Sequence, residues 1–285
     1  MIAYRGRRLL WGGLRSVRDT LTFSTALGRF TVYTRDEAIG RDLFCLRSYE
    51  LDMIEAVTSF LRGKGRLQPE STLVDVGANI GVIAVGMLSL GHLRRAVAVE
   101  PEPRNVDLLR RNISQNGMDA RIWCVAAAVG DARGTIDFEL SETNYGDHRI
   151  RRSEAGGVEE KFSESGRAVT TVPLDTLDDT LAAAPREFTE RIGLVWMDVQ
   201  GAELLVLRGA ERLLASGVPV FCEVWPYGMK RAGTSLQDLS ALVARHWTGF
   251  HVFQSGEFVR RPVSEFPAFL SDLRGSRFEN VLFVD

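Results

Sequence analysis

The feature that most constrains the fold is residues 71–81, STLVDVGANIG. A short apolar run, interrupted by Asp75, is typical of a buried parallel strand, and a second apolar run after the glycines predicts a helix. A strand, a glycine turn and a helix bring backbone N–H groups and a helix N-terminus close to a ligand. Gly77, which lacks a Cβ, would let the backbone approach a nucleoside. The segment therefore predicts a ligand site at the end of a strand.

A second apolar run, at residues 95–100, ends in the carboxylate of Glu100. It follows the glycine turn by about 20 residues, a spacing at which an acidic side chain accepts hydrogen bonds from ribose hydroxyls. Pro101 and Pro103 then open the next predicted helix, residues 104–116. The two segments together predict a nucleoside-containing cofactor at the carboxyl ends of two neighbouring strands.

The turn indicates which cofactor this is. A dinucleotide site has the pattern G-x-G-x-x-G, whose second glycine admits a pyrophosphate. Here only Gly77 and Gly81 are present, and the carboxylate of Asp75 would repel a pyrophosphate but suit the ammonium group of an amino-acid tail. The pattern therefore favours S-adenosylmethionine over NAD. A nicotinamide-dependent oxidoreductase is one alternative function, and a non-catalytic S-adenosylmethionine-binding protein is another.

Apolar runs separated by helical patterns predict a doubly wound α/β fold with a mostly parallel sheet. Ligands of such sheets bind outside the carboxyl ends of the strands. Small residues after the third strand, including Ala127, would either leave room for an adenine ring or pack a tight turn. The expected strands are residues 72–76, 95–100, 121–125, 192–199, 218–224, 249–254 and 279–284, with residues 134–140 as an extra strand. Helices are expected at residues 47–61 and from Gly201 to Gly217, with Glu203 anchoring the turn at the start of the second.

Residues 1–46 are predicted to form an N-terminal extension, and residues 47–285 the main domain. The extension begins with a basic amphipathic helix and continues with a hairpin at residues 20–34. The helix either contacts an anionic membrane or a partner, or packs on the domain. Its apolar core is too short for a signal peptide, and no apolar run is long enough for a transmembrane helix.

The composition of the chain indicates which kinds of partner and which cellular compartment to expect. A net charge of -2 argues against nucleic acid as a partner, because phosphate binding needs a basic surface. Cys45, Cys124 and Cys222 lie far apart in apolar surroundings, which predicts reduced thiols and a cytoplasmic protein. The basic N-terminus leaves peripheral membrane contact open, and the sequence carries no signal for the oligomeric state.

Four motifs together resemble those of the FkbM-type methyltransferases: DVGANIG, VEPEPRNVDLLRRNISQNG, LDTLDD and MDVQGAE. The resemblance covers residues 49–225. It implies S-adenosylmethionine-dependent methylation, usually of a hydroxyl oxygen, on a glycan, a lipid-linked sugar or a polyketide-like metabolite. It also implies a seven-stranded, Rossmann-like methyltransferase sheet whose last strand is antiparallel.

The cofactor is expected to contact residues around the glycine turn and at both strand ends. Tyr49 and Glu50 resemble a Tyr-Glu pair that precedes the glycine motif in the family. The expected cofactor-binding residues are Glu50, Asp75, Gly77, Ala78, Asn79, Gly81, Glu100, Pro101 and Ala127.

Residues 141–167 are rich in Gly, Ser, Glu and Arg and have no apolar period. A loop of this length inside a domain predicts a lid over the acceptor, with an exposed linker as the alternative. Its NYGDHR segment resembles an N-x-G-D-x-R stretch found in part of the family. The expected acceptor-binding residues are Asn144, Tyr145, Arg149 and Gln200.

A hydroxyl acceptor must lose its proton as it attacks, so a general base has to lie within hydrogen-bond reach. Asp198 ends the strand expected beside the cofactor strand, and His148 has the unperturbed pKa nearest to neutrality. We expect one of these two to be the base, with Glu223 as a third candidate.

The acidic LDTLDD motif could be mistaken for a metal site. Aspartates at the start of a helix cap free N–H groups and suit the helix dipole. We therefore expect Asp175, Asp178 and Asp179 to cap a helix, and we expect no metal.

Overall fold

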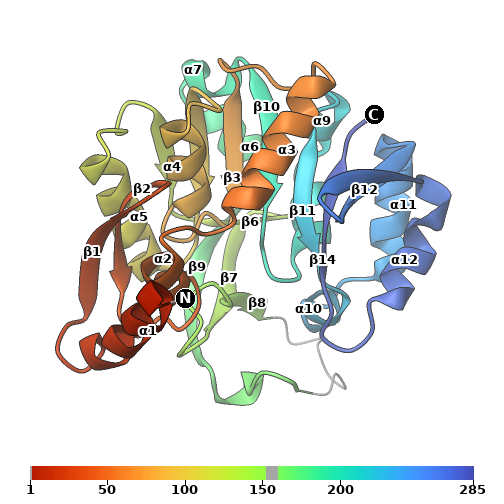
Figure 1. Cartoon of the computed structure of the whole chain (residues 1–285). Coiled ribbons are helices and arrows are strands. Elements are labelled where there is room, and N and C mark those ends of the chain that lie inside the picture. Colours follow the sequence, from red (N-terminus) through yellow and green to blue (C-terminus); the bar gives the residue numbers. More distant parts are fainter. Residues whose placement is uncertain (1, 152–159) are drawn as a thin grey trace.

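The computed structural model describes residues 2–151 and 160–285. Its centre is an eight-stranded sheet in the order β13-β12-β14-β11-β10-β3-β4-β5, with helices on both faces (Figure 1). This confirms the predicted α/β architecture. The strands are β3 (Thr72–Val76), β4 (Arg95–Val99), β5 (Ile122–Val125), β10 (Ile192–Met197), β11 (Val220–Val224), β12 (Gly249–Gln254), β13 (Glu257–Pro262) and β14 (Glu279–Phe283).

Neighbouring strands from β11 to β5 are parallel, and β14 is antiparallel to both of its neighbours, as predicted. Strand β13 is absent from the prediction. It pairs with β12 through a turn at Ser255 and Gly256, which both have positive φ, 51° and 93°. A two-residue turn of this kind matches the twist of the paired strands. The hairpin therefore adds an eighth strand at the edge of the expected seven.

Successive side chains of a strand point to opposite sides of the central sheet, and both sides are apolar. Leu73 and Trp196 pack with one layer of helices, and Val74 and Met197, each the next residue, pack with the opposite layer. With both faces covered, open space for a ligand lies at the strand ends. The first layer contains α3 (Leu51–Gly63), α4 (Val82–Ser89) and α5 (Pro103–Gln115), and the second contains α6 (Leu177–Ala183), α7 (Arg186–Thr189), α8 (Glu203–Arg208), α9 (Glu211–Ala215), α11 (Leu236–His246) and α12 (Phe266–Asp272).

A second sheet, in the order β6-β9-β7-β8, lies near the carboxyl ends of the central strands, at the bottom of Figure 1. The prediction contains β7 as an extra strand but not the sheet, because β6 and β8 have only three residues each and so show no period. The connection from β7 to β8 carries the NYGDHR segment. Residues 152–159 of the predicted lid lie outside the described residues. The strands are β6 (Ala128–Gly130), β7 (Gly134–Leu140), β8 (Arg149–Arg151) and β9 (Ala168–Thr176).

The N-terminal helix and hairpin are confirmed, but the structure adds a helix, α2, and the helix expected from residue 47 begins only at Leu51. Arg47 and Glu50 adopt left-handed conformations, with φ 61° and 51°, so the chain bends between α2 and α3. A domain boundary at residue 46 stays a prediction. The extension consists of α1 (Ile2–Leu14), β1 (Thr20–Thr25), β2 (Gly28–Tyr33) and α2 (Ile39–Leu46).

The single helix expected after Gly201 is broken into α8 and α9. A Cβ at Gly209 would lie 1.9 Å from the carbonyl oxygen of Gly130 in β6, so the two backbones touch there. The start of α6 also lies here, since Asp178 N–H donates to the Gly209 carbonyl at 2.8 Å. Contact with the second sheet therefore interrupts a helix that the sequence pattern would continue.

Of the three aspartates predicted to cap a helix, only Asp178 does so, and the helix is not the one that follows it. The N-cap of α6 is Thr176, which accepts Asp179 N–H at 3.1 Å. Asp175 and Asp179 accept the guanidinium groups of Arg133 and Arg212, at 3.0 and 2.9 Å. Asp178 instead accepts the N–H groups of Arg212 and Leu213, at 2.7 and 3.0 Å, in the first turn of α9. The motif thus joins two helices through their free N–H groups.

Two further sequence expectations concern thiols and membranes. Cys45 and Cys222 are buried free thiols, and Cys124 is a half-buried one. Within residues 2–151 and 160–285, no helix combines the length and the apolar character that a bilayer crossing requires.

Candidate functional site

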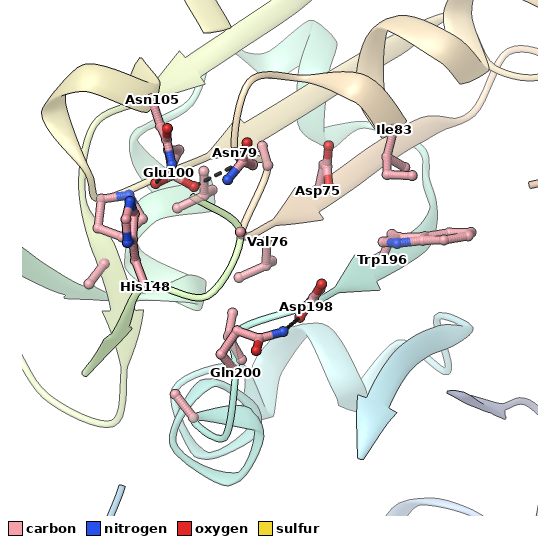
Figure 2. A pocket seen from close by; sticks show the side chains of 18 of the residues that line it. Asp75, Val76, Asn79, Ile83, Glu100, Asn105, His148, Trp196, Asp198 and Gln200 are labelled. Carbon is pink, nitrogen blue, oxygen red and sulfur yellow. Dashed lines mark hydrogen bonds between the residues drawn. The ribbon is translucent and has the colours of Figure 1, made fainter. Parts of the chain in front are cut away.

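A pocket opens at the carboxyl ends of β3, β4 and β10, where the glycine turn, the NYGDHR segment and the bend before α3 meet (Figure 2). It encloses about 880 Å³ of empty space, part of it open solvent. Most of the residues predicted from the sequence line it. These are Glu50, Asp75, Gly77, Ala78, Asn79, Glu100, Pro101, Ala127, Tyr145, His148, Asp198 and Gln200.

Glu100 is buried directly after β4, and its two oxygens hold the neighbouring turns. Oε2 accepts Asn79 N–H at 2.9 Å, and Oε1 accepts Glu102 N–H at 3.0 Å. Burial raises the pKa of Glu100 to about 7. A carboxylate fixed by backbone groups on two sides, with lone pairs left toward the pocket, suits a pair of ligand hydroxyls.

Asp75 lies in β3 on the face that α4 covers. Its Oδ2 accepts Ala84 N–H at 3.1 Å in the first turn of α4, and its burial raises its pKa to about 8. Oδ1 accepts no hydrogen bond from the residues that the structure describes, and Asp75 lines the pocket. Asp75 therefore combines a structural role with a free acceptor oxygen for a ligand.

The fold supplies a further reason for glycine in this turn. At Gly77, φ is 83° and a Cβ would lie 1.9 Å from the carbonyl oxygen of Asp198, so the close contact of two loops excludes a side chain there. Gly77 also lines the pocket, and its predicted role in the approach of a nucleoside stays a prediction. At Gly81, φ is 87° and a Cβ would lie 2.6 Å from Leu109 Cδ1. Gly81 does not line the pocket; it is the N-cap of α4.

Two asparagines fix the NYGDHR segment beside the glycine turn. Asn79 Nδ2 and Asn105 Nδ2 both donate to the carbonyl oxygen of Tyr145, at 2.7 and 3.2 Å. From the other side, Tyr145 N–H donates to Asp36 Oδ1 at 3.3 Å. Side chains from the glycine turn, α5 and the N-terminal extension therefore converge on one residue of the predicted lid.

His148 lies in the pocket wall, stacked on Tyr145 with 5.8 Å between the ring centroids. Its Nδ1 accepts Ser141 N–H at 3.0 Å, so the neutral ring carries its proton on Nε2. Burial, with the charges of Arg167 and Arg104, lowers the pKa of His148 to about 4. The unperturbed pKa that favoured His148 as a base therefore does not apply, and its only free nitrogen is a donor.

Asp198 and Glu223 follow neighbouring strands and share one amide. Gln200 Nε2 donates to Asp198 Oδ1 at 2.5 Å (Figure 2). The same nitrogen donates to Glu223 Oε1 at 3.4 Å. Burial raises the pKa of both carboxyl groups, and the charge of Asp198 raises that of Glu223 further. Glu50 lines the pocket, and burial and the charge of Asp198 raise its pKa to about 7. The site thus concentrates acids that do not all ionise at neutral pH.

Glu203 anchors the next turn, as the sequence suggests. It is fully buried, its Oε1 accepts Gly201 N–H at 3.0 Å, and burial raises its pKa to about 8.

Besides Gly81, three predicted residues lie outside the pocket lining. Glu223 reaches it only through Gln200. Asn144 Oδ1 accepts Gly146 N–H at 3.0 Å, which closes a local turn. Arg149 is buried: its Nε donates to Asp147 Oδ1 at 2.6 Å, and its guanidinium lies 4.5 Å from the ring centroid of Trp225. Asn144 and Arg149 therefore shape the segment instead of facing the pocket.

The network around Arg149 also ties the end of the predicted lid to α10 (Pro226–Arg231). Arg149 Nη1 donates to Glu164 Oε1 at 3.0 Å, and Tyr227 Oη donates to the same oxygen at 2.5 Å. Arg167 Nη2 contacts Asp147 Oδ2 at 2.5 Å. Hydrogen bonds and the Arg149 charge lower the pKa of Glu164 to about 2.

Sequence reasoning missed several lining residues. Asn105 lies one turn into α5, inside the VEPEPRN motif, and that motif was the available signal. Trp196 is part of the apolar β10 and Ile39 of the unpredicted α2, and neither has a polar pattern that could single it out.

Comparison with known proteins identifies the group to which this arrangement belongs. A family model described as "Methyltransferase FkbM domain" matches residues 75–242. The match begins at Asp75 and ends within α11, so it includes the glycine turn, Glu100, Asp198 and Glu223.

Two curated relatives and one solved structure illustrate the similarity. Methyltransferase sdnD of Sordaria araneosa is 27% identical over 49% of this chain, and 2-O-methyltransferase NoeI of Sinorhizobium fredii is 29% identical over 55%. The matches span 60% and 64% of those proteins' own lengths. A crystal structure of methyltransferase FkbM from Methylobacillus flagellatus is 17% identical, with a TM-score of 0.44, over 78% of this chain and 45% of that one.

Proposed function

The chain belongs to the FkbM methyltransferase family, whose cofactor is S-adenosylmethionine, and we propose that it transfers the methyl group to a hydroxyl oxygen of a small-molecule or glycan acceptor. The observation that carries the proposal is the position of Asp198 and Glu223 at the ends of β10 and β11, beside the pocket that Asp75 and Glu100 line. In this proposal the methyl donor and the proton acceptor share one pocket. The relative whose name specifies an oxygen, 2-O-methyltransferase NoeI, supports the choice of atom.

Each end of the cofactor has a matching group. Glu100, fixed by Asn79 and Glu102 N–H groups, would accept the two ribose hydroxyls. The free oxygen of Asp75 would accept the ammonium group of the methionine tail, which favours the ionised carboxylate. Ala127 and Pro101 also line the pocket and would contact the adenine ring. These assignments leave Asp198 on the side where the methyl group has to meet its acceptor.

The reaction is an in-line displacement at the methyl carbon. The acceptor oxygen forms a bond to that carbon while the carbon–sulfur bond breaks, and its electron pair stays on sulfur, which gives S-adenosylhomocysteine. The protein contributes mainly by positioning the two reactants. The acceptor proton moves to Asp198, whose hydrogen bond from Gln200 favours the ionised form.

Glu223 has a different role in this proposal. Burial, and then the charges of Asp198 and other neighbouring acids, raise its pKa to about 10, so in this proposal Glu223 is the acid of the pair that keeps its proton. Gln200 would hold the acceptor with the neutral Glu223 behind it, and Tyr145 and the Nε2–H of His148 would be further contacts. Glu50 lies at the pocket mouth. Asn144 and Arg149 act by shaping the lid.

A labelled-methyl assay tests the proposal. The chain is incubated with S-adenosylmethionine that carries a tritiated methyl group and with separate pools of oligosaccharides, lipid-linked sugars and polyketide-like alcohols. Mass spectrometry of the labelled product then locates the methyl group. Transfer to oxygen that is lost in Asp198→Asn supports the proposal; transfer to nitrogen contradicts it. Binding of the cofactor with no turnover in any pool would favour the non-catalytic alternative.

A further inference from the structure

Helix α1 has one face packed on the protein and another face open. Trp11 is buried against Phe44 of α2, with 5.4 Å between the ring centroids, and Arg7 Nη1 donates to the Cys45 carbonyl at 2.9 Å. These contacts settle how the helix is held, and they correspond to one of the two alternatives that its amphipathic sequence left open.

The opposite face carries apolar side chains that nothing in the described residues covers. Leu9 is 82% exposed and Leu10 62% exposed, and Val17, just beyond the helix, is 73% exposed. Single exposed leucines are ordinary. Here two exposed leucines are adjacent on one helix, and an exposed valine follows in the turn after that helix, so we treat the three as a patch. We call Leu9, Leu10 and Val17 the apolar patch.

Arginines surround the apolar patch. Arg5, Arg8 and Arg18 are exposed and have no ion-pair partner within the described residues. Residues 2–18 contain no Asp or Glu. Of the acids close to this region, Glu37 and Asp42 are already paired with Arg15 and Arg41, and the exposed Asp19 follows Arg18 directly. The face is therefore apolar and has an excess of positive charge.

We propose that this face, Leu9, Leu10 and Val17 with Arg5, Arg8 and Arg18, docks the protein on an anionic lipid surface. Leucines that enter the headgroup boundary beside arginines that meet lipid phosphates are the two components of interfacial binding by an amphipathic helix. A protein partner would have to supply both an apolar groove and a ring of acids. An anionic lipid surface offers apolar acyl chains and negative headgroups over its whole area, which is why we choose it as the occupant.

The placement of the face relative to the pocket adds a consequence. Helix α1 packs on α2, and α2 begins at Ile39, which lines the pocket. Docking through α1 would thus keep the pocket close to the lipid surface, with α2 between α1 and the pocket. The docking itself does not depend on the proposed methyl transfer, and its test does not use that activity.

Co-sedimentation of the full chain with vesicles tests the proposal. Vesicles of phosphatidylcholine alone are compared with vesicles that contain phosphatidylserine, at low and high salt. We expect binding to the anionic vesicles only, and weakening of that binding by salt. Equal binding to both vesicle types, or no binding at low salt, would overturn the proposal.

Two variants locate the surface. The pair Arg5→Glu and Arg8→Glu should lower the partition coefficient at least 10-fold, since each surface charge contributes about 5-fold; the pair Leu9→Ser and Leu10→Ser should lower it comparably. Arg111→Glu on α5 and Phe278→Ser, both exposed and distant in sequence, are the matched controls. Unchanged thermal unfolding and S-adenosylhomocysteine binding would show that the variants are folded.

Two results would contradict this assignment of the face. One is loss of vesicle binding in the control variants to the same extent as in the α1 variants. The other is self-association of the wild-type chain that the two serines abolish in sedimentation velocity, which would make a second copy of the chain the occupant.

Discussion

Gln200 Nε2 lies 2.5 Å from Asp198 Oδ1 and so holds the carboxylate that ends β10 in one orientation at the pocket. The same nitrogen lies 3.4 Å from Glu223 Oε1. One amide therefore links two acids on neighbouring strands, of which one has to accept a proton in the proposed reaction and the other has to keep its own.

The substitution Asp198→Asn separates these roles. It should lower kcat by about 10²–10⁴, the usual contribution of a general base, with little change in cofactor affinity. Glu223→Gln replaces a protonated acid by a neutral isostere and should keep kcat within about 10-fold of the wild type. Steady-state kinetics on the acceptor found in the labelled assay make the comparison. A larger loss from Glu223→Gln than from Asp198→Asn would reverse the assignment.

His148→Gln provides a second contrast. Because His148 is neutral with its proton on Nε2, a glutamine can still offer an N–H group, and we expect less than about a 10-fold loss in kcat and an unchanged pH profile. Loss of a kinetic pKa near 6–7 in this variant, measured from kcat against pH, would show that His148 does accept the proton.

Cofactor binding should strengthen as the pH rises through neutrality. The pKa of Asp75 is raised to about 8 and that of Glu100 to about 7, so the free protein holds protons that an ammonium-bearing ligand has to displace. Affinity for S-adenosylhomocysteine should then rise between about pH 6 and pH 8, by up to about 10-fold per pH unit for each proton released. Calorimetry in buffers of different ionisation enthalpy measures those protons. The slope should shrink in Asp75→Asn; a slope of the opposite sign would refute the account.

Asn105 should control the order of the NYGDHR segment. Asn105→Ala removes one of two amide donors to the Tyr145 carbonyl, at a cost of roughly 1 kcal/mol in local stability. Amides near residues 143–147 should exchange hydrogen about 5-fold faster. Asn116→Ala, at the other end of α5, is the control, because Asn116 bonds to the N-terminal hairpin. Equal exchange in both variants would remove the proposed link.

The buried network of Glu164 should make folding sensitive to acid. Its pKa is lowered to about 2 in the folded state, so its contribution is present above the ordinary glutamate pKa of about 4.3 and is lost as the pH falls toward 2. Glu164→Gln should lower the free energy of unfolding at neutral pH by about 3–5 kcal/mol and flatten the acid limb. Chemical denaturation at several pH values checks this, with the exposed Glu142→Gln as control.

The core of the fold was predictable because each local sequence pattern there is compatible with only one kind of secondary structure. The run LVDV lies within an observed strand, Thr72–Val76, since a short apolar segment between a turn and a glycine has few other uses. By contrast α2, β6 and β8 are too short to show a period, and the break at Gly209 depends on Gly130, a contact that no local pattern encodes.

The site divides in the same way. Asp75 and Glu100 were recognisable because their chemistry follows from their place at strand ends. The environments of Arg149 and Gly77 were not predictable because they come from distant parts of the chain. Trp225 and Glu164 enclose Arg149, and the Asp198 carbonyl excludes a side chain at Gly77. Spacing predicts which residues share a strand end, whereas burial among distant partners appears only in the fold.

The most direct test of the central claim is calorimetric titration of the full chain with S-adenosylhomocysteine, with NAD as the competing ligand and Glu100→Gln as the site variant. We expect micromolar binding of S-adenosylhomocysteine, no binding of NAD, and at least about a 10-fold loss in Glu100→Gln, since a hydrogen bond to a charged group contributes about 1.5–3 kcal/mol. Glu102→Gln, whose Oε2 caps α5, controls for general damage to this turn. A folded chain that binds no S-adenosylhomocysteine, or binds it equally well without the Glu100 carboxylate, would contradict the account.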